Sequence, residues 1–170
     1  GLLVAGWGEP LAAAKVRFTF DGWQGPPVRV YVTRPVALAS DRPVVFVMHG
    51  TLRNAADYRD QWHDLAMAHD FLLVVPEFSK ADFPGAAGYN LGHQYDGEGR
   101  ARPQATWSYS VIEPLFEDIR KRFSLTTPHY SLYGHSAGAQ FVHRYLFYVP
   151  QARVSRIVPA NAGWYMMPDY

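Results

Sequence analysis

The length of 170 residues is enough to bury the core of one domain, and it leaves little room for a second. Hydrophobic residues make up 48% of the chain and charged residues 18%, which excludes a disordered protein. The net charge is +1 with Lys and Arg scattered, which excludes a nucleic-acid-binding surface, and the absence of cysteine excludes disulfides, thiolate metal sites and a cysteine nucleophile. No apolar run approaches the roughly 20 residues of a membrane helix, so we expect a soluble domain without a transmembrane segment.

The chain begins with a predicted hairpin. Residues 15–20 and 28–33 are rich in β-formers and flank turn residues at 21–27, which indicates two antiparallel strands joined by a loop. The uninterrupted apolar run 44–48 is typical of a central strand that is covered on both faces. A second such run follows at 71–75, and Pro76 is expected to end it.

Between these two apolar runs the sequence predicts an amphipathic helix. Asn54 is the expected N-cap, with Asp57 three residues later. The predicted apolar face consists of Tyr58, Trp62, Leu65 and Ala66, and the predicted exposed face of Arg59, Asp60, His63 and Asp64. A strand–helix–strand unit of this length implies parallel pairing with a right-handed crossover.

The second half of the chain opens with a long loop at 77–102, whose aromatic residues favour an ordered conformation. A second helix is predicted at 112–123, with Pro114 in its first turn or at a kink. A further strand is predicted at 154–160, although Pro159 makes its end uncertain. Strands that alternate with helices after an antiparallel start indicate an α/β fold.

A strand followed at once by a helix is predicted around Ser136. Residues 130–133 are rich in Tyr and Leu, and apolar residues recur at helical spacing from Phe141 to Leu146. The pattern G-x-S-x-G lies between them. A serine on so sharp a turn has strained backbone angles, and Gly134 and Gly138 remove the crowding on either side of it. This context favours Ser136 as a nucleophile over a residue that merely caps the helix.

Residues 134–138 resemble the nucleophile elbow of the α/β-hydrolase superfamily. Together with the run 49–55, Tyr58 and Trp62, they are similar to the esterase and poly(3-hydroxybutyrate) depolymerase-like group, which includes feruloyl-esterase relatives. The likeness covers most of residues 28–164. It implies an α/β-hydrolase fold, with a mostly parallel sheet, helices on both faces and an antiparallel N-terminal hairpin. Members of this group are often exported.

The resemblance also implies roles for individual residues. A serine hydroxyl needs a base to take its proton, and the oxyanion that then forms needs fixed donors. The implied donors are the backbone N–H groups of Ala137 and of Thr51, and Leu52 is the nearest competitor of Thr51. Gly50 is expected to let the backbone approach the substrate. The alternative for the His49–Gly50 pair is a plain turn that ends a strand.

The expected catalytic base is missing. In α/β-hydrolases an Asp or Glu and then a His follow the serine. After Ser136 the only acidic residue is Asp169, and the only histidine is His143. His143 lies about 10 Å further along the predicted helix, at ~1.5 Å per residue. His135 is inside the elbow, where its side chain is expected to face the packing side of the turn.

Only residues 161–170 follow the last predicted strand, whereas another strand–helix–strand unit takes about 30 residues. We therefore expect residues 1–170 to be the N-terminal portion of a single α/β-hydrolase domain whose C-terminal strands are missing from this chain. The acid and histidine are then expected beyond residue 170 or on a second chain. Two alternatives stay open: a degenerate, inactive member of the fold, and a rearranged triad that uses His49, His93 or His129.

The sequence thus predicts a serine carboxylic-ester hydrolase that acts on a small or polymeric ester, forms an acyl-enzyme and needs no cofactor. The alternatives are a serine peptidase of the same fold and a non-catalytic binding or scaffold protein. Trp107 and Trp164 are expected near the rim of the elbow, where they are candidates for a substrate pocket or for core filling. No metal site is expected, because the acidic turn at 96–99 lacks the ligand order of a calcium loop. The His-Asp pairs at 63–64 and 69–70 are interpreted as an exposed helix face.

Overall fold

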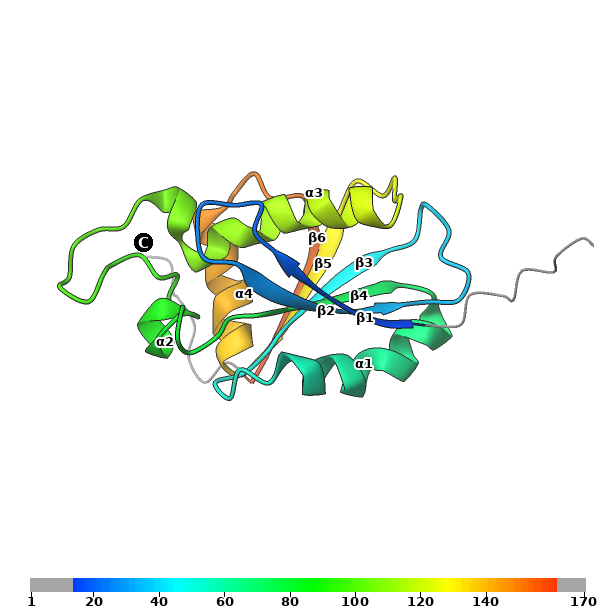
Figure 1. Cartoon of the computed structure of the whole chain (residues 1–170), viewed down its shortest axis with the longest axis horizontal. Coiled ribbons are helices and arrows are strands. Elements are labelled where there is room, and N and C mark those ends of the chain that lie inside the picture. Colours follow the sequence, from blue (N-terminus) through cyan, green and yellow to red (C-terminus); the bar gives the residue numbers. More distant parts are fainter. Residues whose placement is uncertain (1–13, 162–170) are drawn as a thin grey trace, which may run out of the picture.

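The computed structural model describes residues 14–161, which form one mixed β-sheet with helices on both faces (Figure 1). The strands are β1 (Ala14–Phe20), β2 (Val28–Arg34), β3 (Val44–Met48), β4 (Leu72–Glu77), β5 (Tyr130–His135) and β6 (Val154–Ala160). The helices are α1 (Ala55–His69), α2 (Gly85–Gly88), α3 (Ile112–Arg122) and α4 (Ala137–Tyr148). Two short 3-10 turns, η1 (Gln104–Thr106) and η2 (Ser108–Val111), precede α3.

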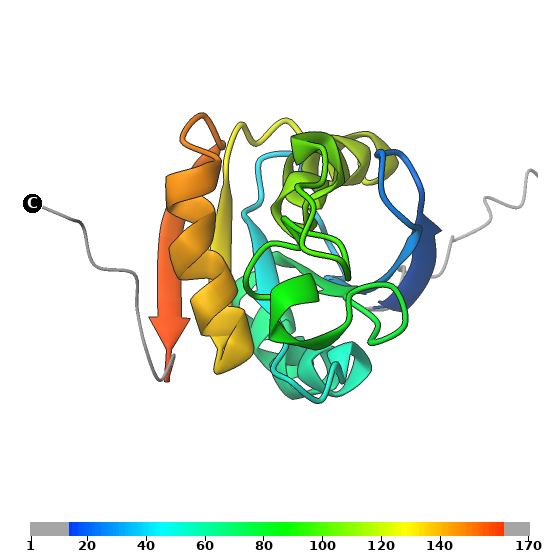
Figure 2. The ribbon, with the colours of Figure 1, turned by 90° about the vertical axis from the view of Figure 1, so that its left-hand side faces the viewer.

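The order of strands in the sheet is β1-β2-β4-β3-β5-β6. The predicted N-terminal hairpin is confirmed, because β1 pairs antiparallel with β2, and β2 in turn pairs antiparallel with β4. Strand β3 lies between β4 and β5 and is parallel to both, and β5 is also parallel to β6. Figure 2 shows β1 and β6 at the two opposite edges. The mostly parallel α/β sheet is as predicted.

Two hydrophobic clusters hold the layers together, one on each face of the sheet. The larger cluster joins the sheet to α3 and α4, with Phe46 and Leu132 on the strands, Phe116 on α3 and Phe141 on α4. The smaller cluster lies under α1, which packs on β2, β3 and β4. Within residues 14–161, α4 packs on β5 and β6 from the other face. No helix of this part of the chain is both long and apolar enough to cross a membrane.

Pro76 does not end its strand as predicted. Strand β4 continues to Glu77, and Pro76 pairs with Val30 of β2. The pairing of β4 with β3 ends at Val74. Position 76 therefore has a neighbouring strand on one side only, which is the situation in which a sheet accepts a proline without an amide hydrogen. Pro159 likewise lies within β6, where it pairs with Gly134.

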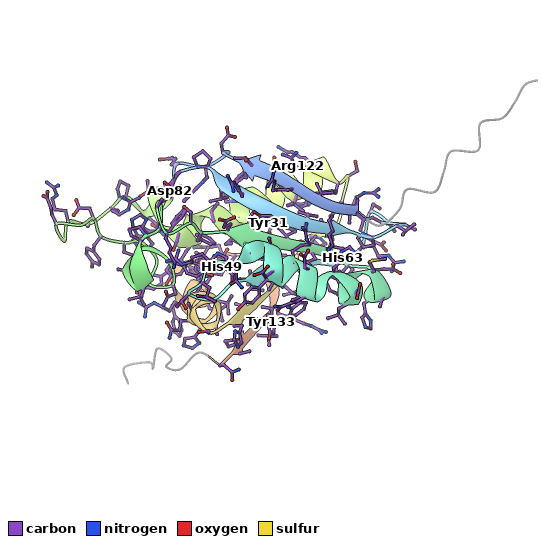
Figure 3. All side chains as sticks on the ribbon, turned by 60° about the horizontal axis from the view of Figure 1, so that its bottom comes forward. Tyr31, His49, His63, Asp82, Arg122 and Tyr133 are labelled. Carbon is purple, nitrogen blue, oxygen red and sulfur yellow. The ribbon has the colours of Figure 1, made fainter. Side chains whose placement is uncertain are left out.

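The predicted polar face of α1 is also wrong in part. The Arg59 guanidinium donates to the carbonyls of Val16 and Val32, and His63 Nδ1 lies 2.8 Å from the Thr33 hydroxyl. Figure 3 looks onto this side of the sheet and labels His63. Leu65, predicted on the apolar face, is 45% exposed instead. The helix is rotated because β1 and β2 offer carbonyls and a buried hydroxyl that only polar side chains satisfy.

The loop at 77–102 is ordered by buried aromatic residues, as predicted. Phe78, Phe83 and Tyr89 are buried and pack against one another, with the rings of Phe78 and Tyr89 4.9 Å apart. Tyr95 is different, because it is 61% exposed and forms a bridge with Ala101. The helix expected at 112–123 is α3, and Pro114 lies in its first turn, where a helix tolerates proline.

Candidate active site

Ser136 lies at the carboxyl edge of the sheet, between β5 and α4. Its backbone has φ 56° and ψ −117°, a region that costs a non-glycine residue on the order of 1–3 kcal/mol. Its amide donates to the Ala160 carbonyl at 3.0 Å, so β6 holds the turn in place. Ser136 occupies the N-cap position of α4, yet within residues 14–161 its side chain makes no capping hydrogen bond. The hydroxyl is therefore not used in the way that the capping interpretation requires.

Close backbone contacts explain both glycines of the elbow. A Cβ built on Gly134 would overlap the carbonyl of Gly138, and a Cβ on Gly138 would overlap the carbonyl of Met48. The first contact allows the chain to reverse within the elbow. The second lets the start of α4 approach the end of β3. Neither position has room for any side chain, which is the crowding that the sequence pattern predicts.

The register of the sheet brings the turn after β3 beside the elbow. Met48 pairs with Gly134, so the residues that follow both strands lie next to each other. A Cβ built on Gly50 would be 3.8 Å from Cβ of Ser136. Gly50 begins a turn in which the Arg53 amide donates to the Gly50 carbonyl at 3.1 Å. The amides of the two central residues, Thr51 and Leu52, are not used by a turn of this kind.

His49 anchors this turn from below. It is fully buried; Nε2 accepts from the Phe78 amide at 2.9 Å, and Nδ1–H therefore donates to the Gly50 carbonyl at 3.0 Å. The Tyr89 hydroxyl donates to the His49 carbonyl at 2.7 Å. Burial lowers the pKa of His49 to about 4. With both nitrogens engaged in the neutral form, His49 is a structural residue, and the rearranged triad that uses it is excluded.

A pocket of about 170 Å³ joins the elbow to this turn. Its walls include Gly50, Thr51, Leu52, Tyr58, His135 and Ser136, and we call it the Ser136 pocket. Ser136 is half-buried, so its hydroxyl is reachable from outside. At the start of α4, the amides of Ala139 and Gln140 donate to the Ser136 carbonyl. Ala137 is the first residue of this helix, so its amide has no acceptor within the helix. The positive end of the α4 dipole lies at the same place.

Tyr58 connects the two sides of the Ser136 pocket. Its hydroxyl lies 3.2 Å from Nδ1 of His135, and a Cβ built on Gly50 would lie 3.2 Å from the same hydroxyl. Burial raises the pKa of Tyr58, so the hydroxyl stays protonated at neutral pH. His135 packs toward α1 as expected, but it is half-buried and also borders the pocket. Sequence periodicity placed Tyr58 on an apolar helix face and carried no signal of this link.

No histidine of residues 14–161 hydrogen-bonds the Ser136 hydroxyl. His129 is exposed at the start of β5, the far end of the strand from Ser136. His93 packs against the Phe83 ring. His143 lies on α4 beside Phe147, two turns beyond the elbow. The described residues thus bring together a serine and candidate amide donors, without a base.

Trp107, one of the two tryptophans proposed for a substrate pocket, is not among the described walls of the Ser136 pocket. Trp107 is half-buried, donates from Nε1 to the Arg102 carbonyl at 3.1 Å and packs edge-on against Tyr148 of α4. It lies at the margin of the larger hydrophobic cluster, which corresponds to the core-filling alternative. Trp164 lies outside the described residues.

Solved structures resemble this chain closely. A poly(aspartic acid) hydrolase from Sphingomonas sp. KT-1 has 45% sequence identity and a TM-score of 0.89, with 94% of this chain and 60% of that one aligned. A poly(3-hydroxybutyrate) depolymerase from Bordetella parapertussis has 37% identity and a TM-score of 0.84, with 92% and 55% aligned. An acetyl xylan esterase from Aspergillus awamori shares the fold at 15% identity, with a TM-score of 0.62 and 84% and 51% aligned.

This chain therefore spans 60% and 55% of the lengths of the first two relatives. No protein-family model matches the sequence, and a search of curated proteins also finds no match. The solved neighbours are hydrolases, and two of them share more than a third of their aligned residues with this chain.

Proposed function

We propose that this chain, which has the α/β-hydrolase fold of the esterase and depolymerase-like group, carries the nucleophile and oxyanion hole of a serine carboxylic-ester hydrolase. The observation that carries the proposal is the Ser136 hydroxyl: it stands on a strained turn, is not used as a helix cap, and borders a pocket shared with the turn at Thr51. Hydrolase neighbours at 45% and 37% identity support the same reaction class.

The proposed reaction proceeds through an acyl-enzyme. Ser136 Oγ attacks the ester carbonyl carbon as a base removes its proton, and the carbonyl oxygen becomes an oxyanion. The C–O bond to the alcohol then breaks, and the base returns the proton to the leaving alkoxide. Water repeats the sequence on the acyl-enzyme and releases the carboxylic acid.

The oxyanion would be held by the Ala137 amide and by an amide of the turn after β3. Thr51 is the proposed second donor, and Leu52 stays the alternative because both residues border the Ser136 pocket. Each such donor is worth about 2.7–4 kcal/mol of barrier in other serine hydrolases. Glycine at position 50 lets the Tyr58 hydroxyl lie close to this turn, since a Cβ at this position would crowd that hydroxyl at 3.2 Å.

The acid and the histidine are proposed to come from a C-terminal part of the same domain, either beyond residue 170 or on a second chain. Two findings support this: no histidine of residues 14–161 bonds to Ser136, and the chain aligns with only 60% and 55% of its two relatives. Residues 1–170 are then the N-terminal portion of one α/β-hydrolase domain.

The decisive experiment is fluorophosphonate labelling of the complete gene product. Labelling is expected in the wild type and in Ser40→Ala, an exposed loop serine, and is expected to be lost in Ser136→Ala. Ester hydrolysis should fall with it by about 10⁴-fold or more. If the complete protein is not labelled, the scaffold alternative replaces this proposal.

Amide hydrolysis is the second candidate. The relative at 45% identity is named for poly(aspartic acid), whose units are joined by amide bonds. The same serine and oxyanion hole serve both reactions, but the leaving amine must be protonated before it departs. Parallel assays with an ester and the corresponding amide decide between the two, because a higher kcat/KM on the amide would reverse our assignment.

A further inference from the structure

A second pocket also borders the turn at Thr51. It measures about 220 Å³, and its walls include Thr51, Arg53, Lys80, Pro84, Tyr89 and Asn90. We call it the Lys80 pocket. At ~30 Å³ for a water-sized group, its volume fits about seven non-hydrogen atoms. Its size therefore suits a short side group of a substrate rather than a polymer chain.

Two connections link the Lys80 pocket to the proposed nucleophile. Thr51 borders both this pocket and the Ser136 pocket. In the second connection, the Asn90 amide nitrogen donates to the Gln140 side-chain oxygen at 2.5 Å. The Gln140 backbone amide in turn donates to the Ser136 carbonyl at 3.2 Å. Because the two pockets share Thr51, the Lys80 pocket is a neighbouring pocket for a substrate held at Ser136.

Two positive charges of this pocket have no acidic partner among residues 14–161. The Arg53 guanidinium donates to the carbonyls of Phe78 at 2.6 Å and Gly85 at 3.0 Å, which hold it in place without cancelling its charge. Burial lowers the pKa of the Arg53 guanidinium, because its charged form is less stable away from water. Lys80 is exposed and forms no ion pair within the same residues.

The nearest acidic residue along the chain, Asp82, is engaged elsewhere. It accepts from the Ser79 hydroxyl at 3.2 Å, and it borders a different pocket together with Arg29 and Glu77. The remaining walls of the Lys80 pocket combine the polar residues Thr51 and Asn90 with apolar surface, which includes the Tyr89 ring, over which Arg53 lies at 4.7 Å. Phosphate sites present many backbone amides, whereas this pocket offers apolar walls with two cations.

We propose that the Lys80 pocket binds a carboxylate-bearing group of the substrate, with its methylene stem against Pro84 and Tyr89 and its charge facing Lys80 and Arg53. This inference rests on the proposed hydrolase function, and it narrows the substrate class to esters or amides with a free carboxylate near the scissile bond.

The test compares matched anionic and neutral substrates on the complete gene product. For the acyl side, the pair is 4-nitrophenyl hemisuccinate and its methyl ester; for the leaving-group side, it is 4-acetoxybenzoate and its methyl ester. Lys80→Gln is expected to lower kcat/KM about 5-fold for the anionic member of one pair, and Lys80→Glu more strongly. The neutral members should change less than about 2-fold. Lys121→Gln, an exposed lysine on α3, is the matched control and should change neither.

The pair that responds identifies which side of the substrate enters the pocket. Unchanged anionic-to-neutral ratios for both pairs in both Lys80 variants would overturn the proposal while leaving the hydrolase function intact. If the complete protein hydrolyses none of the four substrates, the proposed function fails instead. The pocket is then tested by calorimetric titration with glutarate: weaker binding in Lys80→Glu than in Lys121→Gln supports it, and equal binding refutes it.

Discussion

The Tyr58 hydroxyl lies 3.2 Å from Nδ1 of His135, and a Cβ built on Gly50 would lie 3.2 Å from the same hydroxyl. A single side chain of α1 thus spans the two loops that would supply the two oxyanion donors. The neighbours of Tyr58 come from the ends of two different strands, which the parallel register of β3 and β5 brings together.

Tyr58→Phe is expected to slow the reaction without unfolding the protein. The variant keeps the ring and loses only the hydroxyl, so the turn at Gly50 is less firmly positioned against Ser136. Small misplacements of catalytic groups are costly, and we expect kcat to fall about 10-fold with KM little changed. Tyr31→Phe, on the same side of the sheet but away from the pocket, is the control. A loss of stability with unchanged kcat would contradict this prediction.

Gly134→Ala is expected to destabilise the fold rather than merely slow it. The added methyl group would meet the Gly138 backbone, which cannot move without displacing α4. We expect a loss of about 3 kcal/mol or more in the free energy of unfolding, measured by urea denaturation. Gly97→Ala is the matched control, because its Cβ would meet no atom within 4 Å. Equal stability of the two variants would show that the elbow is looser than described.

Acid should destabilise the fold through His49. Its pKa in the folded protein is about 4, below the ordinary value of 6.5, so the unfolded chain binds more protons between these two pH values. The contribution of His49 is complete above about pH 6.5 and is lost as the pH falls toward 4. From pH 7 to pH 5 the loss is on the order of 2 kcal/mol.

His49→Gln isolates this contribution. Glutamine retains an acceptor for the Phe78 amide but does not titrate, so its loss of stability from pH 7 to pH 5 should be smaller by about 2 kcal/mol. The measurement is urea denaturation at both pH values. His129→Gln, an exposed site, keeps His49 intact and should behave as the wild type. Identical losses in His49→Gln and the wild type would mean that His49 is not the group responsible.

The orientation of α1 can be tested with two adjacent residues. Ala66 is fully buried between α1 and the sheet, and Leu65 is 45% exposed. Ala66→Leu should therefore cost about 1–3 kcal/mol through overpacking, whereas Leu65→Gln should stay within about 0.5 kcal/mol of the wild type. Thermal denaturation of both variants is sufficient. A loss of about 1–3 kcal/mol in Leu65→Gln as well would restore the helix face predicted from periodicity, which includes both residues.

The local pattern of the sequence determined the α/β class, the strands at 44–48 and 130–135, and the strained turn around Ser136. Runs of apolar β-formers and glycines at fixed distances from a serine act over a few residues, and their physical causes are equally local. The same reasoning failed at Pro76 and on α1. Whether a proline is tolerated depends on which strand lies beside it, and whether Arg59 faces solvent depends on the carbonyls that β1 and β2 offer.

Only the tertiary structure decided how the candidate site is assembled. The pairing of Met48 with Gly134 places the turn at Thr51 beside Ser136, although 85 positions along the chain separate the two residues. The link from Tyr58 to His135 joins α1 to the end of β5, and the hydrogen bond from the Phe78 amide to His49 joins the ends of β4 and β3. Contacts between residues far apart in the chain are set by the packing of whole strands and helices, and no short segment of sequence records that packing.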